Sequence, residues 1–62
     1  MNLMDTVFAN TNFADEAENY KFYGITDFDE ILDDVRENLA EYEATEEECR
    51  EYAEKIYDAV QG

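Results

Sequence analysis

The feature of this sequence that most limits its fold is an excess of negative charge. Eighteen of the 62 residues are aspartate or glutamate and four are lysine or arginine, which gives a formal net charge of −14 at neutral pH. A chain of this length forms one small domain with a marginal core, and a substrate cleft between two lobes does not fit in it. We therefore expect a single acidic domain over residues 1–62 and no enzymatic activity.

The apolar residues indicate that the chain folds despite this charge. Charge excess of this kind is typical of disordered chains, but 45% of the residues are apolar or aromatic. One apolar stripe with helical spacing consists of Phe28, Ile31, Leu32, Val35, Leu39 and Tyr42. Thr26 and Asp29 form an approximate capping box before it. The pattern predicts a helix from Asp27 to Glu43.

A second stripe predicts a helix from Glu46 to Gln61. It consists of Cys49, Tyr52, Ala53, Ile56, Tyr57 and Val60. Thr45, followed by Glu48, has the pattern of a capping box. Because two residues separate the helices, we expect an antiparallel hairpin. The residues expected to be buried together are Ile31, Leu32, Val35, Leu39, Ile56 and Val60.

The first 25 residues must cover the apolar face that the hairpin leaves exposed. The apolar residues available for this are Val7, Phe8, Phe13, Tyr20, Phe22, Tyr23 and Ile25. The spacing after Asn12 predicts a short helix that ends before Gly24, whereas residues 20–25 also fit a strand paired with residues 3–8. The expected fold class is all-α, a small antiparallel helical hairpin covered by an N-terminal segment that includes a third short helix. The alternative is an α+β fold with a short N-terminal β-hairpin.

Several chemistries lack the residues they require. The chain has no histidine or serine and one cysteine, Cys49, which excludes serine triads, internal disulfides and zinc sites of the usual kinds. Residues 27–30 do not begin an EF-hand calcium loop, because Ile31 and Leu32 stand where that loop needs an oxygen ligand and a glycine. We expect no metal and no cofactor. The lone thiol and the absence of a signal peptide or membrane span fit a cytoplasmic protein.

The acidic residues gather opposite the apolar stripes. Fourteen of the 18 acids lie from Asp27 onward, and like charges recur four residues apart, which destabilises a helix. A solvent-exposed helix face explains where the acids lie, but it does not explain why they so outnumber the lysines and arginines. A negative electrostatic field that attracts a basic partner explains both. A halophilic cytoplasm is a further explanation. The candidate partner-binding residues are Asp29, Glu30, Asp33, Asp34, Glu37 and Glu41 on the first predicted helix and Glu47, Glu48, Glu51, Glu54 and Asp58 on the second.

The charge density of the predicted hairpin is close to that of duplex DNA. Two helices of about 16 residues extend about 24 Å, a length over which about seven base pairs present about 14 phosphates. In size, charge and helical pattern the whole chain resembles the small phage-encoded DNA-mimic inhibitors of the anti-CRISPR and anti-restriction type.

That resemblance implies an inhibitor that occupies the DNA-binding groove of a bacterial defence complex in the host cytoplasm. A CRISPR surveillance complex is the first candidate, because it grips DNA backbones with basic surfaces. Direct binding to nucleic acid or lipid membranes is not expected, since both are anionic. A monomer is favoured, with a dimer as the alternative. The alternative function is an acidic regulatory or antitoxin-like partner of a basic protein, bound outside its nucleic-acid site.

Overall fold

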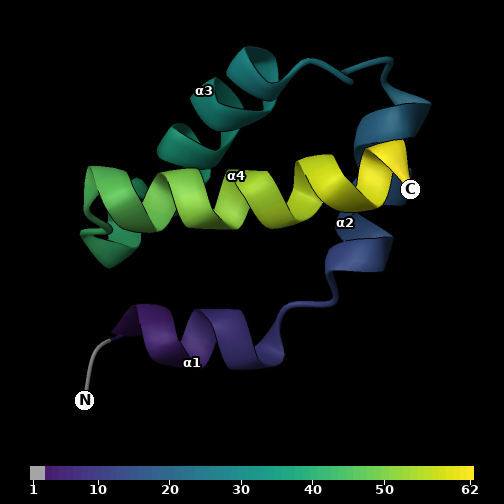
Figure 1. The fold of residues 1–62 in the computed structure, drawn as a ribbon. Coiled ribbons are helices and arrows are strands. Elements are labelled where there is room, and N and C mark those ends of the chain that lie inside the picture. Colours follow the sequence, from purple (N-terminus) through teal and green to yellow (C-terminus); the bar gives the residue numbers. More distant parts are fainter. Residues whose placement is uncertain (1–2) are drawn as a thin grey trace.

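A computed structural model describes residues 3–62 (Figure 1). Its elements are α1 (Leu3–Asn10), α2 (Phe13–Phe22), α3 (Phe28–Leu39), the 3₁₀ turn η1 (Ala40–Tyr42) and α4 (Glu46–Gln61). The described part of the chain contains no strand, so the all-α prediction is confirmed and the N-terminal β-hairpin is wrong. None of the helices within residues 3–62 has the length and apolar character needed to cross a bilayer.

The central element is α4, against which both α3 and α2 pack (Figure 1). The chain reverses direction between α3 and α4, which confirms the predicted hairpin. In the same view α2 crosses near the C-terminal end of α4, and α1 lies on the side of α4 away from α3. The resulting domain is elongated, with extents of 33 × 19 × 15 Å.

The core lies where the apolar stripes of α3 and α4 meet. All six side chains expected there are buried, and Ile31, Val35 and Ile56 are fully so. Burial of this apolar surface is the main free-energy gain of folding. The N-terminal helices add Met4 and Ala17 to the buried set. Met4 is a contribution that the sequence patterns did not indicate.

Two helix starts agree with the predictions. The Thr45 hydroxyl accepts a hydrogen bond from the Glu48 amide at 3.2 Å, and Glu48 Oε1 accepts one from the Thr45 amide at 2.9 Å. This reciprocal pair is a complete capping box. The side chain of Asn12 similarly accepts hydrogen bonds from two amides in the first turn of α2.

The helix predicted from Asp27 to Glu43 is shorter than expected. Asp27 occupies its N-cap without a side-chain cap hydrogen bond, so the predicted capping box at Thr26 is wrong. The α-helix ends at Leu39 and tightens into η1. Glu43 then adopts a left-handed conformation with φ of 55°, which ends helical propagation and turns the chain toward α4.

Two of the residues proposed to cover the core do not do so. Phe22 is 83% exposed and Tyr23 is 73% exposed. The other five expected residues do cover the core: Tyr20 is buried, and Val7, Phe8, Phe13 and Ile25 pack partly buried against it. Phe22 does not cover the core because it lies about 200° around α2 from the buried Tyr20, and Tyr23 follows the last residue of that helix.

Candidate functional site

The first candidate surface is the outer face of α4. At about 100° per residue, Glu47, Glu54 and Asp58 lie about 200–240° around the helix axis from the buried Tyr52. These acids and Glu51 are exposed. Within residues 3–62 the side chains of these four acids form no ion pair or hydrogen bond. The ammonium group of Lys55, on the same helix, lies 5.9 Å from the centroid of the Phe13 ring, so these four acids present negative charge without an ion-pair partner among the described residues.

The outer face of α3 has a similar character. Asp29, Glu30 and Glu37 are exposed, and the described residues provide no hydrogen-bond or ion-pair partner for their carboxylates. Asp33 differs, because its Oδ1 accepts a hydrogen bond from Arg36 Nη1 at 3.0 Å. The predicted acidic face of this helix is thus present, with one member paired.

Two arginines, Arg36 of α3 and Arg50 of α4, bind the same carboxylate in the first turn of α4. Arg36 of α3 donates to Glu46 of α4 through Nε at 3.0 Å and Nη2 at 2.5 Å, and Arg50 Nε donates to the same carboxylate at 3.4 Å. Hydrogen bonding from Arg36 is the main reason that the pKa of the Glu46 carboxyl lies below its ordinary value. Both arginines therefore bind where α3 meets the first turn of α4, and Asp33 is the one carboxylate of the two outer faces within residues 3–62 that they pair.

Three of the predicted partner-binding residues lie elsewhere. Glu48 is half-buried and completes the capping box of α4. Asp34 is half-buried, and Glu41 is exposed on η1. Asp34 and Glu41 line a groove on another side of the molecule, so the eleven residues do not form one continuous face.

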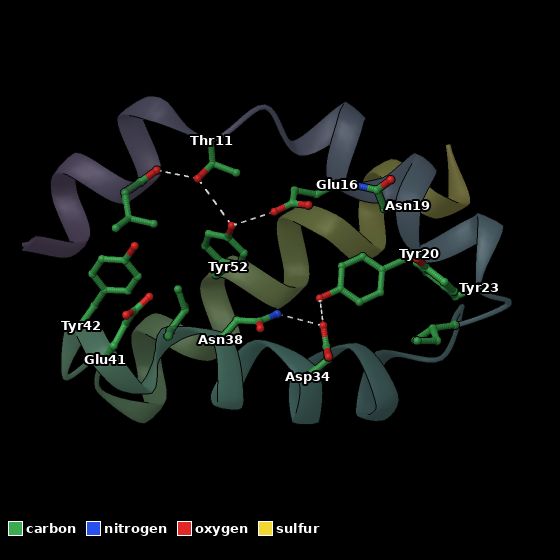
Figure 2. A pocket seen from close by; sticks show the side chains of 13 residues that line it. Thr11, Glu16, Asn19, Tyr20, Tyr23, Asp34, Asn38, Glu41, Tyr42 and Tyr52 are labelled. Atoms are coloured by element: carbon green, nitrogen blue, oxygen red, sulfur yellow. Dashed lines mark hydrogen bonds between the residues drawn. The ribbon is translucent and has the colours of Figure 1, made fainter.

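This groove has a volume of about 510 Å³ and lies between α1 and α2 on one side and α3 on the other (Figure 2). Tyr52 of α4 forms part of its floor. Its lining contains three carboxylates, those of Glu16, Asp34 and Glu41. Four of the five tyrosines also line it: Tyr20, Tyr23, Tyr42 and Tyr52. The lining contributed by residues 3–62 includes no lysine or arginine.

Hydrogen bonds hold the polar groups of the groove in place. The Tyr20 hydroxyl donates to Asp34 Oδ2, which also accepts from Asn38 Nδ2 at 3.0 Å (Figure 2). The Tyr52 hydroxyl donates to Glu16 Oε1 at 3.4 Å. Two carboxylates from different helices are thus positioned by tyrosines.

Because Tyr20 is buried, we expect the stability of the fold to fall at alkaline pH. Burial, followed by the hydrogen bond to Asp34, raises the pKa of the Tyr20 hydroxyl above its ordinary value near 10. The unfolded chain therefore loses this proton at lower pH than the folded chain, so Tyr20 adds stability below about pH 10 that is lost as the pH rises further.

We expect Tyr20→Phe to weaken this alkaline loss while costing about 1 kcal/mol at neutral pH, because one hydrogen bond to Asp34 is removed. Urea unfolding between pH 7 and about pH 11 measures both effects. If the difference in unfolding free energy between the variant and the wild type stays the same from pH 7 to about pH 11, ionisation of Tyr20 is not the cause of the alkaline loss.

Because the outer carboxylates repel one another, we expect added salt to stabilise the fold. Added salt would destabilise a fold held together by ion pairs. Raising the ionic strength from about 0.01 M to about 0.1 M shortens the screening length from about 30 Å to about 10 Å. Since the net charge is −14, we expect the melting temperature to rise over this range. A melting temperature that falls would show that the Arg36 and Arg50 ion pairs outweigh the repulsion.

Sequence patterns indicated the acids of α3 and α4 but not the groove. Glu16 was not singled out, although it precedes Tyr20 by one helical turn, and that spacing was the available signal.

The described residues contain no group of three or more acidic, histidine or cysteine side chains arranged to hold a metal ion. No protein-family model, curated protein sequence or solved structure matches the chain. Its function is inferred from its own charge and surfaces.

Proposed function

We propose that the protein is a DNA-mimic inhibitor that occupies the nucleic-acid-binding groove of a bacterial defence complex. A CRISPR surveillance complex is the first candidate target. The supporting observation is the set of exposed, unpaired carboxylates on the outer faces of α3 and α4, which the two arginines between these helices do not neutralise.

The dimensions of α4 suit this function. Its 16 residues extend about 24 Å, the length of about seven base pairs with about 14 phosphates, and six of these residues are acidic, so α3 contributes further charge. Like charges at Glu47 and Glu51, and at Glu54 and Asp58, repeat at four-residue spacing on an exposed face. A solvated helix gains nothing from such pairs, because they are mutually repulsive. A partner rich in lysine and arginine converts the repulsion into attraction.

The inhibitor then acts by steering and occupancy, without chemistry. Its field accelerates encounter with a basic groove and fixes the orientation of docking. DNA and inhibitor compete because both satisfy the same lysine and arginine side chains. The result is stoichiometric exclusion of DNA.

The decisive experiment is reciprocal competition on a purified target. Candidate targets are recovered at low salt from a lysate of bacteria that carry CRISPR and restriction systems, and each is purified free of DNA. We expect prebound inhibitor to exclude labelled DNA, and prebound DNA to exclude the inhibitor. If both bind together at saturation, mimicry at that site is wrong. Recovery of a basic partner without a nucleic-acid site favours an acidic regulatory or antitoxin-like protein.

A further inference from the structure

Two of the large apolar side chains exposed within residues 3–62 line the groove described above, one near each end (Figure 2). The large hydrophobic residues exposed within residues 3–62 are Leu3, Phe22, Tyr23 and Tyr42. Tyr23 and Tyr42 line the groove described above. Leu3 lines a second hollow of about 310 Å³, which shares Tyr42 with the groove. Phe22 contacts Tyr23 edge to face, with ring centroids 5.3 Å apart. Tyrosine is enriched at protein interfaces, where its ring packs and its hydroxyl forms hydrogen bonds.

The backbone at the end of α2 keeps two of these rings outside the core. Gly24 has φ of +75°, a conformation that glycine adopts without steric cost. The amide of Ile25 donates to the carbonyl of Tyr20 at 2.9 Å, and that of Gly24 to the carbonyl of Lys21 at 3.0 Å. These two bonds form a Schellman motif, which ends the helix here. Tyr23 therefore lines the groove and Phe22 packs against its ring, and both stay outside the core.

Charge and apolar surface are arranged in order along the groove. Tyr23 lies at one end in Figure 2 and Tyr42 at the other, with Asp34 and Glu16 between them. Glu41 stands beside Tyr42. A complementary ligand has an apolar group at each end and positive charges between them, opposite Glu16, Asp34 and Glu41. Arginine is well suited to these positions, because its guanidinium group stacks on aromatic rings and hydrogen-bonds to carboxylates.

We propose that this groove binds an extended segment of a protein partner, with apolar side chains at both ends and arginine between them. The groove follows α3, whose 12 residues extend about 18 Å. At about 3.3 Å per residue, a bound strand of five or six residues spans that length. A second copy of this chain is disfavoured as the occupant, because it also carries a charge of −14.

This proposal goes beyond DNA mimicry, because the groove is formed by the side of α4 that carries Tyr52 and not by its outer acidic face. The two surfaces can be tested separately. Failure of groove binding leaves competition with DNA untouched, and failure of that competition leaves groove binding untouched.

The test uses the full chain and a blocked hexapeptide with leucine at both ends, two central arginines and a glycine beside each leucine. Because the chain has no tryptophan and four of its five tyrosines line the groove, tyrosine fluorescence reports binding, and calorimetry measures affinity. We expect binding to weaken when the leucines are replaced by glycine and to vanish when the arginines are replaced by glutamate.

Matched variants locate the site. The double variant Phe22→Ala/Tyr23→Ala should weaken peptide binding about tenfold or more, as expected for aromatic anchors. Glu41→Gln should weaken it about two- to threefold, a typical effect for an exposed charge. Glu54→Gln removes the same charge from the outer face and should leave binding unchanged.

Three results would overturn the proposal. One is an equal effect of Glu41→Gln and Glu54→Gln, which would mean general charge attraction. Another is the absence of binding at millimolar peptide. The third is a dimer in sedimentation that the Phe22→Ala/Tyr23→Ala variant abolishes, which would make a second copy the occupant.

Discussion

Replacement of Leu39 by alanine is expected to leave most molecules unfolded at room temperature. Leu39 is 3% exposed and belongs to the core between α3 and α4. Truncation of a buried leucine costs about 2–5 kcal/mol, through lost burial and the cavity left behind. A single core in a domain of this size rarely supplies more than about 3–5 kcal/mol of net stability. The expected loss is therefore comparable to the entire stability of the fold.

The same substitution at an exposed leucine provides the control. Leu3 is 62% exposed, so Leu3→Ala should change stability by about 0.5 kcal/mol or less. Urea unfolding followed by far-UV circular dichroism compares the two variants. Similar midpoints for Leu39→Ala and Leu3→Ala would mean that the core is not where the structure locates it.

The second large effect concerns inhibition. Reversal of Glu54 and Asp58 to lysine should reduce affinity for the target about a hundredfold or more, because like charges facing each other in an interface cost several kcal/mol. The fold should tolerate the change. Both residues are exposed, and Asp58 lies in the last turn of α4, where a cation interacts favourably with the helix dipole.

A matched double reversal separates position from net charge. Asp5 and Glu18 are exposed on α1 and α2, and their replacement by lysine alters the total charge by the same amount. We expect this control to retain most of the inhibition, apart from slower association. Equal losses in the two variants, measured by DNA competition at fixed salt, would argue against a contact through the outer face of α4.

The hairpin was predictable because its signal is local. The helical period of the apolar residues determines which faces of α3 and α4 meet, and Thr45 with Glu48 marks the start of α4. The end of α3 was not predictable from that period. It depends on the left-handed conformation of Glu43, which the connection to α4 requires and which glutamate rarely adopts.

Other features depend on tertiary packing. Residues 3–8 fit a strand as well as a helix, and the burial of Met4 follows only once α1 docks on the rest of the domain. Exposure of the outer acids follows from amphipathic pattern alone, but the groove is lined by side chains from all four helices. Its acidic and tyrosine residues are scattered from Glu16 to Tyr52 in sequence, so no local motif links them.

The central position of α4 also determines when the chain can fold during its synthesis. The ribosome makes α1, α2 and α3 before the helix against which α2 and α3 pack. At about 5–20 residues per second, the 16 residues of α4 take a further one to three seconds or so. During that interval the apolar stripe of α3 has no partner from α4. The core between α3 and α4 therefore cannot form until α4 has been made and has emerged from the ribosome, so the domain folds late in its synthesis and as one unit.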